Sequence, residues 1–453
     1  MYGDDDPIAA FATTAGNSAL TLIRCCGKGS IDLASSVFAP AKNAEGNTVV
    51  HGWIVNKGEK IDEVLVSVFR SPKSYTGEDS LDICCHGGFS AGKAVMEALK
   101  DAGFRDALPG EFTFRSFLNG KLDLTRCESV MELVGAKTET GRSHAVSRLS
   151  GSLEKEINEI KQLLVKVLTG AEIYLDYSED EVSADTDEIK GKLPYQDIAQ
   201  EVLQRLKKLS ATWQMERLYQ EGVTAVIAGR PNAGKSSLFN SLLKEDRSIV
   251  TEAAGTTRDW IEAWVSIEGI PIRLVDTAGL RNTAEPAEKI GVEKSRKLLQ
   301  EADLVLYLLD GTQGVTDEDK QELEGKKYLL LWNKCDISPQ PQPISGSIPI
   351  CISAKTGEGL AALYSSITKT IKANSGPDLQ TSEVSLGSAR QKKLVDVSCA
   401  ALEEALELAN KEEALDIIAP LLREAVNALG EITGEVSTSD ILDEMFSNFC
   451  VGK

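Results

Sequence analysis

Residues 229–236 read Gly-Arg-Pro-Asn-Ala-Gly-Lys-Ser, and this stretch decides the fold. It has the G-x-x-x-x-G-K-S spacing of a phosphate-binding loop, in which backbone N–H groups surround phosphate oxygens. An apolar strand candidate at 223–228 precedes it, and a helical segment at 236–243 follows it. A strand, a glycine-containing loop and a helix in this order predict a P-loop nucleotide site.

Two motifs are expected to handle the phosphates. In the loop, we expect Lys235 to reach the β- and γ-phosphates and Ser236 to bind Mg²⁺. Further along the chain, Asp276-Thr277-Ala278-Gly279 ends the apolar segment IRLVD. Asp276 would hold Mg²⁺ through water, and the Gly279 N–H would contact the γ-phosphate.

Two later motifs favour a guanine base. Asn333-Lys334-Cys335-Asp336 ends the segment YLLLWN, and Ser353-Ala354-Lys355 ends IPICI. The Asp336 carboxylate can accept two hydrogen bonds from the imino and amino groups of guanine, which adenine does not offer. The second motif can close over the guanine O6 through its backbone. Together the motifs predict GTP rather than ATP.

The residue that orients the attacking water is not obvious. Many small GTPases carry a glutamine directly after the Asp-x-x-Gly motif, but this chain has Leu280. Arg258 and Arg281 lie in the adjoining segments, and Glu285 and Glu288 are the nearby carboxylates. From the residues alone, either glutamate is a solvated surface residue or a catalyst.

The pattern along the chain predicts a multidomain α/β protein. Residues 1–121 read as α+β, with a hairpin across the turn NKGEK, and 122–218 and 379–453 read as helical. Residues 219–378 alternate strands with helices, so we expect a Ras-like P-loop α/β domain inserted into a helical domain. The expected strands of that domain are 223–228, 272–275, 304–309, 328–332 and 348–352.

Composition excludes several classes of protein. The 453 residues carry a formal charge of −20, which argues against a protein that coats nucleic acid or binds an anionic membrane surface. No apolar run approaches the roughly 18 residues of a membrane span. The N-terminus lacks the basic and apolar regions of a signal peptide. Nine cysteines without a C-x-x-C motif indicate reduced thiols and a cytoplasmic location.

Five stretches give a closer resemblance. They are GRPNAGKSSLFNSL (229–242), IVTEAAGTTRDW (249–260), DTAGLRNTAEPAEKIGVEKS (276–295), LPGEFTFRSFLNGKLDLTRCESV (108–130) and EITGEVSTSDILDEMFSNFCVGK (431–453). They span all the expected domains. With these stretches the chain resembles the tRNA modification GTPase MnmE (TrmE) family.

The resemblance implies a solution for the missing glutamine. Family members use K⁺, and by motif its ligands would be the Asn232 side chain with Thr251, Ala253 and Thr256. Thr257 would join Ser236 at Mg²⁺. Glu288 would orient the water, which makes it a catalytic candidate beside Lys235. The residues expected to contact GTP are Asn232, Ala233, Gly234, Lys235, Ser236, Ser237, Thr251, Glu252, Ala253, Ala254, Gly255, Thr256, Thr257, Asp276, Thr277, Ala278, Gly279, Asn333, Lys334, Asp336, Ser353, Ala354 and Lys355.

The resemblance also implies a folate site in residues 1–121, a domain that mediates homodimerisation in the family. By motif, Arg24, Glu78, Lys121 and the terminal Lys453 would bind 5,10-methylene-tetrahydrofolate. Residues 15–21 read AGNSALT, whereas the family usually has a glycine-rich turn there. Cys450 would lie near the modification chemistry as a catalytic candidate with a reactive thiol.

The implied function is modification of C5 of the tRNA wobble uridine, as part of a hetero-oligomer with an MnmG-type protein that uses FAD and NADH. Because the chain is acidic, that partner is expected to provide much of the tRNA contact. Two alternatives stay open. One is a regulatory GTPase of ribosome assembly without modifying activity. The other is a helical scaffold whose G domain holds nucleotide without turnover.

Overall fold

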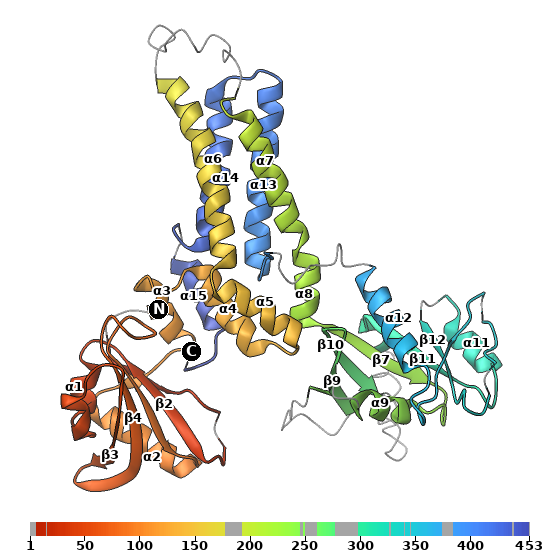
Figure 1. Cartoon of the computed structure of the whole chain (residues 1–453), viewed down its shortest axis with the longest axis horizontal. Coiled ribbons are helices and arrows are strands. Elements are labelled where there is room, and N and C mark those ends of the chain that lie inside the picture. Colours follow the sequence, from red (N-terminus) through yellow and green to blue (C-terminus); the bar gives the residue numbers. More distant parts are fainter. Residues whose placement is uncertain are drawn as a thin grey trace. The chain divides into compact units, whose positions relative to one another are not determined.

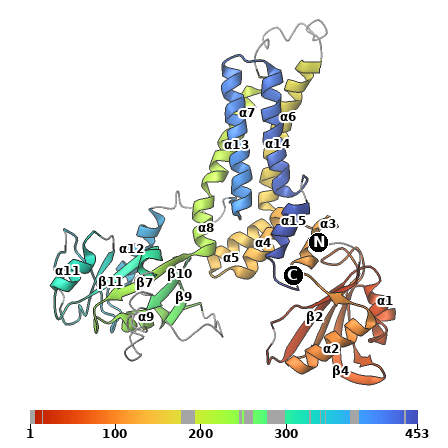
Figure 2. The same ribbon diagram turned by 180° about the vertical axis from the view of Figure 1, so that it is seen from behind.

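The computed structural model describes residues 6–14, 16–176, 193–244, 248–249, 261–276, 298–325, 328–338, 340–344, 346–373, 384–436 and 439–452. The chain divides into two compact units, whose elements are shown from opposite sides in Figures 1 and 2. Unit 1 comprises residues 1–131, 154–199 and 400–453, and unit 2 comprises 132–153 and 200–399.

Unit 1 contains a mixed six-stranded sheet in the order β3-β4-β5-β2-β1-β6. Neighbouring strands are antiparallel except β1 and β6, which are parallel. The strands are β1 (Ile8–Phe11), β2 (Leu20–Cys26), β3 (Thr48–Asn56), β4 (Glu59–Phe69), β5 (Ser80–His86) and β6 (Arg105–Asp106).

The predicted hairpin is confirmed. β3 ends at Asn56 and β4 begins at Glu59, so Lys57 and Gly58 form the two-residue turn, both with positive φ. Such a turn matches the twist of the strands it joins. One face of the sheet packs against α1 (Ser30–Ala34) and α2 (Phe89–Ala102), and its core includes residues such as Ile23, Ile83 and Leu99.

Helices complete unit 1. α3 (Glu111–Leu118), α4 (Leu124–Gly135) and α15 (Ser439–Ser447) share a cluster of Phe114, Leu124, Cys127, Phe446 and Phe449. The long helices α6 (Ser152–Asp176) and α14 (Leu415–Thr433) lie side by side in both ribbon views, and Arg423 pairs with Glu172 at 2.6 Å. The predicted helical spacing of Leu153, Ile157, Ile160, Leu164 and Val167 is confirmed, because all five are buried along α6.

Unit 2 contains a seven-stranded sheet in the order β13-β12-β11-β7-β10-β9-β8. The strands are β7 (Val223–Gly229), β8 (Ser248–Ile249), β9 (Ile261–Ile267), β10 (Ile270–Asp276), β11 (Leu304–Asp310), β12 (Leu329–Asn333) and β13 (Ile350–Cys351). β8 and β9 run antiparallel to their neighbours, and the other five strands are parallel. The five predicted strands are confirmed. β9 was not predicted.

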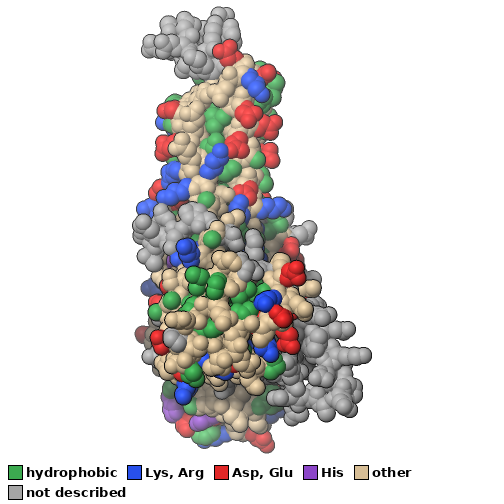
Figure 3. All heavy atoms as spheres, turned by 90° about the vertical axis from the view of Figure 1, so that its right-hand side faces the viewer, with side chains coloured by type: hydrophobic (Ala, Val, Ile, Leu, Met, Phe, Trp, Pro, Cys, Tyr) green, Lys and Arg blue, Asp and Glu red, His purple; other side chains and the backbone are tan. Residues whose placement is uncertain are grey.

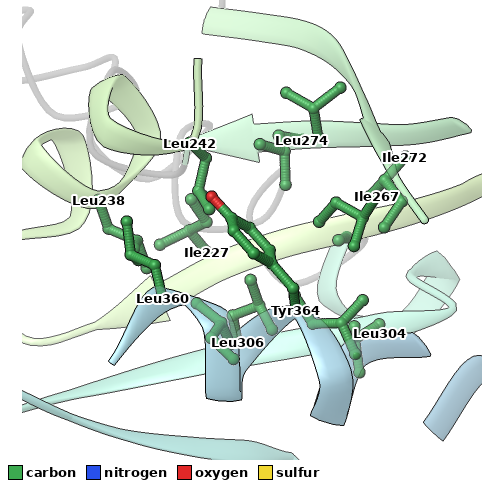
Figure 4. Close-up of a cluster of buried hydrophobic side chains, with 14 of the residues drawn as sticks. Ile227, Leu238, Leu242, Ile267, Ile272, Leu274, Leu304, Leu306, Leu360 and Tyr364 are labelled. Carbon is green, nitrogen blue, oxygen red and sulfur yellow. The ribbon is translucent and has the colours of Figure 1, made fainter. Parts of the chain in front are cut away.

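Helices cover both faces of this sheet. α9 (Lys235–Lys244) and α12 (Leu360–Lys372) send Leu238, Leu242, Leu360 and Tyr364 onto one face, as Figure 4 shows. α11 (Asp317–Leu323) belongs to the cluster on the other face. Every residue of the interior strand β11 is therefore buried, which explains its unbroken apolar run, LVLYLL.

Four further helices flank this α/β block in the sequence. α5 (Glu139–Leu149) and α8 (Trp213–Glu221) lie in unit 2, whereas α7 (Gln196–Ala211) and α13 (Ala389–Asn410) have residues in both units. Ser210 of α7 donates a hydrogen bond to Asp396 of α13 at 2.8 Å. Among the residues that the structure describes, no helix is both long and apolar enough to cross a membrane. The predicted multidomain fold class is confirmed, while the domain boundaries after residues 121, 218 and 378 stay predictions.

Candidate nucleotide and cofactor sites

The P-loop lies between β7 and α9. Gly229 has a φ of +138°, and a Cβ there would lie 2.4 Å from the Leu308 carbonyl oxygen, so only glycine fits beside β11. The Lys235 ammonium donates hydrogen bonds to the carbonyl oxygens of Gly229 at 3.0 Å and Arg230 at 2.9 Å. The loop thus curls around the side chain that is expected to meet the phosphates.

Ser236 of α9 and Asp276, the last residue of β10, meet beside the loop. The Ser236 hydroxyl donates to the Asp276 carboxylate at 2.7 Å, and Asp276 is almost fully buried at the end of β10. A hydroxyl and a carboxylate are hard oxygen ligands, which Mg²⁺ prefers. Of the predicted Mg²⁺ ligands, Ser236 is placed here, and Thr257 lies outside the described residues.

Asn333 joins three predicted motifs. Its side-chain amide donates to the Ala233 carbonyl of the P-loop at 2.7 Å, and its side-chain oxygen accepts from the Ala354 N–H at 3.0 Å. Asp336 and Lys355 are exposed and Ser353 is buried. The structure therefore brings the phosphate loop and both predicted guanine-binding motifs together.

Asp310 was missed by sequence reasoning. Its carboxylate accepts from the Lys334 ammonium at 2.7 Å and from the Thr312 hydroxyl at 2.6 Å. Burial opposes its ionisation, but these hydrogen bonds outweigh burial and lower the pKa of Asp310. An ionised Asp310 holds Lys334 in place, and the carboxylate that ends the apolar strand LVLYLLD was the available signal.

Several predicted site residues lie outside the described part of the chain. They are Thr251, Glu252, Ala253, Ala254, Gly255, Thr256, Thr257, Thr277, Ala278, Gly279, Glu288 and Lys453. Of the predicted K⁺ ligands, only Asn232 is described. It is exposed in the P-loop with a φ of +63°.

A second candidate site lies on the sheet of unit 1, where Arg24 is half-buried. Its Nε donates to Asp82 across the β2–β5 ladder at 3.0 Å. Its guanidinium carbon lies 5.7 Å from the Tyr75 ring and 5.9 Å from the Phe112 ring. Its Nη1 is 3.5 Å from the Gly452 carbonyl oxygen. This places the chain's C-terminal segment against the predicted folate residue.

Glu78 and Lys121, the other predicted folate residues that are described, lie at the adjoining loop. Glu78 pairs with the buried Arg115 at 3.2 Å. Lys121 is exposed and donates to the Pro72 carbonyl at 3.0 Å. Asp82 and Tyr75, like Arg115, were not predicted.

Cys26 and Cys450 differ in their surroundings. Burial raises the pKa of Cys26 far above its ordinary value, which keeps that thiol neutral. Cys450 is exposed, and its backbone carbonyl accepts from the Gly110 N–H at 3.3 Å. The backbone contact fixes the segment that carries the Cys450 thiol.

Comparison with known proteins identifies the family. A family model described as "GTP-binding protein TrmE N-terminus" matches residues 7–121, and one described as "MnmE helical domain" matches 124–450. A relative from Treponema denticola named tRNA modification GTPase MnmE is 41% identical, over 100% of this chain and 99% of its own length. The chain belongs to the MnmE family of tRNA modification GTPases.

The MnmE of Aquifex aeolicus is 40% identical, over 99% of this chain and 100% of its own length. This agreement confirms the predicted family and the prediction of a GTP-hydrolysing enzyme in tRNA modification. A solved structure of Era from Aquifex aeolicus is 25% identical over 40% of this chain and 66% of its own, with a TM-score of 0.26. That score is too low to carry weight, so membership of the MnmE family rests on the sequence relatives and family models.

Proposed function

We propose that this MnmE-family GTPase is activated by K⁺ and acts in the cytoplasm as a homodimer, together with an MnmG-type protein that uses FAD and NADH. Together they would install an aminomethyl or carboxymethylaminomethyl group on C5 of the tRNA wobble uridine. The carbon would come from 5,10-methylene-tetrahydrofolate. The role in tRNA modification is supported by the family relatives, and the folate part is supported chiefly by Arg24, which lies near two aromatic rings and the C-terminal segment.

The GTP site follows from the contacts of the P-loop. Lys235 would leave its backbone partners for phosphate oxygens, and Asp336 would accept hydrogen bonds from guanine. Ser236 and Asp276, with Thr257, would hold Mg²⁺ there. When bound, Mg²⁺ neutralises charge on the phosphates. Through its hydrogen bonds to Ala233 and Ala354, Asn333 would hold the phosphate-binding loop and the guanine-binding motif in fixed positions relative to each other.

Catalysis is proposed to use Glu288 because Leu280 cannot orient water. Asn232, with Thr251, Ala253 and Thr256, would hold K⁺, which adds positive charge where the transition state becomes more negative. We expect GTP turnover to be at least about tenfold faster in KCl than in NaCl at equal ionic strength. Equal rates in both salts would contradict K⁺ activation.

The site around Arg24 suits a folate. A folate combines a flat, aromatic pteridine with an acidic tail. Tyr75 and Phe112 offer aromatic surfaces, and Arg24, Lys121 and Lys453 would supply positive charge. Glu78 would accept hydrogen bonds from the pteridine. Cys450 is proposed to be the reactive thiol of this site, so Cys450→Ser should remove tRNA modification and leave GTP turnover intact.

The outer face of the β3–β4 hairpin supports a homodimer. Val49, Trp53 and Leu65 lie on this face and are 65%, 40% and 49% exposed. Exposed apolar patches on soluble proteins commonly mark protein interfaces. We expect light scattering to give the mass of a dimer, and Trp53→Glu to shift the population toward monomer.

Charge suggests how tRNA is shared between this chain and its partner. Figure 3 shows Asp and Glu side chains interspersed with Lys and Arg on the face that it displays, and the whole chain carries −20. Because phosphate contacts dominate tRNA affinity, a more basic partner would hold most of the tRNA. Tight binding of tRNA by this chain alone at physiological salt would contradict this.

Mass spectrometry of the wobble uridine tests the proposed function directly. A deletion strain should lack the C5 group, and the intact gene should restore it. Unchanged modification after deletion would instead favour the regulatory GTPase of ribosome assembly.

A further inference from the structure

Lys137 connects three elements of unit 2. It directly precedes Thr138, the N-cap of α5. Its ammonium lies 3.6 Å from the centre of the Trp264 ring on β9 and donates to the carbonyl oxygen of Glu221, the last residue of α8, at 3.3 Å. Both contacts are favourable, because a cation is attracted to an aromatic face and to the C-terminal carbonyls of a helix.

Two glycines mark where the β9–β10 hairpin approaches α5 and α8 closely. A Cβ on Gly269, in the turn between β9 and β10, would lie 2.3 Å from the Thr140 hydroxyl of α5. A Cβ on Gly222, directly after α8, would lie 2.1 Å from the Pro271 carbonyl oxygen of β10. The β9–β10 hairpin is thus in direct contact with α5 and with the end of α8, and a shift of the hairpin must displace them.

A buried charge network makes α5 and α8 one block. Arg148 of α5 donates to Glu216 of α8 at 2.6 Å, and to Glu132 at 2.6 Å. His144 of α5 is within 2.8 Å of the same Glu216. Ser385, which lies between the G domain and α13, accepts from Arg148 at 2.8 Å. These bonds tie α5, α8, Glu132 and Ser385 together through buried charged groups.

The hairpin lies between two segments expected to respond to nucleotide. β9 follows residues 251–260, which hold three of the four proposed K⁺ ligands and Thr257. β10 ends at Asp276, which contacts Ser236 at the proposed Mg²⁺ site. β9 and β10 are paired along their whole length, so the hairpin directly joins these two segments.

We propose that Lys137 is a positioning residue that couples the β9–β10 hairpin to the α5–α8 block, so that the nucleotide state of the G domain reaches the helical region. This rests on the proposed function, in which GTP turnover serves tRNA modification. Trp264 is its partner in the coupling. Neither residue is among those expected to contact GTP, so GTP turnover should continue when the contact is lost.

Hydrogen exchange of the full-length protein in KCl, with GDP or a non-hydrolysable GTP analogue, tests the coupling. In the wild type, exchange in α5 and in the hairpin should both depend on nucleotide. In Lys137→Met, the nucleotide-dependent difference in α5 should fall at least about fivefold while that in the hairpin persists. Lys137→Arg keeps the cation and should retain the nucleotide-dependent difference in α5 exchange. Trp264→Leu removes the aromatic ring and should reduce this difference as Lys137→Met does.

Lys320→Met is the control, because Lys320 is an exposed lysine of α11 that pairs with Asp317. The modification yield per GTP hydrolysed should fall in Lys137→Met and stay normal in the control. No dependence of α5 exchange on nucleotide in the wild type, or an unchanged one in Lys137→Met, would overturn the coupling. Absence of modification in the wild type would contradict the proposed function. The coupling would then be tested by the hydrogen-exchange measurements alone.

Discussion

Gly234 and Asn333 lie so close that a Cβ added to Gly234 would be 2.2 Å from the Asn333 side-chain nitrogen. Gly234 also has a φ of +100°, a conformation that side chains with a Cβ rarely adopt. Asn333 in turn holds the P-loop through Ala233. The phosphate loop and the guanine motif therefore depend on the absence of a side chain at one position.

Gly234→Ala should weaken binding of both GDP and GTP at least about tenfold, because the Cβ displaces Asn333 and strains the loop. Fluorescent GDP titration measures the change. Gly135→Ala is the control, since a Cβ at Gly135 would meet nothing within 4 Å. Wild-type affinity in Gly234→Ala would show that Asn333 can move without loss.

Glu288→Ala should keep GTP binding and lose about 100-fold or more in turnover, as expected when a residue that orients or deprotonates water is removed. Single-turnover measurements in KCl separate the two effects. Glu285→Ala, three residues away, should retain turnover. If Glu288→Ala turns over GTP at the wild-type rate, another group orients the water.

Glu216 should make stability depend on acid pH. Burial alone would raise its pKa, but its bonds to His144 and Arg148 outweigh burial and lower the pKa from 4.5 to about 2. Because the folded pKa is below the unfolded value, this stabilisation is present above pH 4.5 and is lost as pH falls toward 2.

Glu216→Gln should therefore lower the thermal midpoint most above pH 4.5, and its difference from the wild type should shrink toward pH 2. Unfolding scans across this range measure it. Glu139→Gln removes an exposed partner of Arg142 and should change the midpoint little. A difference that stays constant with pH would mean that Glu216 acts through packing and not charge.

Local motifs made much of unit 2 predictable. The P-loop and the segments that contain Asp276 and Asn333 each follow an apolar run, so their place at strand ends could be predicted from neighbouring residues. β9 was missed. Its residues include Glu262 and Trp264, and it pairs as an antiparallel strand with β10, which the parallel pattern did not suggest.

Contacts between distant residues were not predictable in this way. Arg24 meets Asp82 because β2 and β5 pair in a register that aligns these two positions, which are 58 residues apart in the chain. Lys137 meets Trp264 only because α5 packs on the hairpin. Such contacts depend on tertiary packing, and no spacing in the sequence encodes them.

The pairing of Arg24 with Asp82 leads to a last prediction. The Asp82 carboxylate holds the guanidinium near the Tyr75 and Phe112 rings, so it would present the remaining N–H groups of Arg24 to a folate. Arg24→Met should weaken binding of 5,10-methylene-tetrahydrofolate by about tenfold or more, as for loss of a hydrogen bond to a charged group. Asp82→Asn, which keeps the shape and removes the charge, should weaken folate binding less.

Calorimetry measures both affinities. Lys93→Met is the control, because Lys93 lies on α2, which packs on the other face of the sheet. Equal affinity in Arg24→Met and the wild type would place the folate elsewhere, whereas a loss confined to Arg24→Met would show that Arg24 needs no carboxylate to hold its direction.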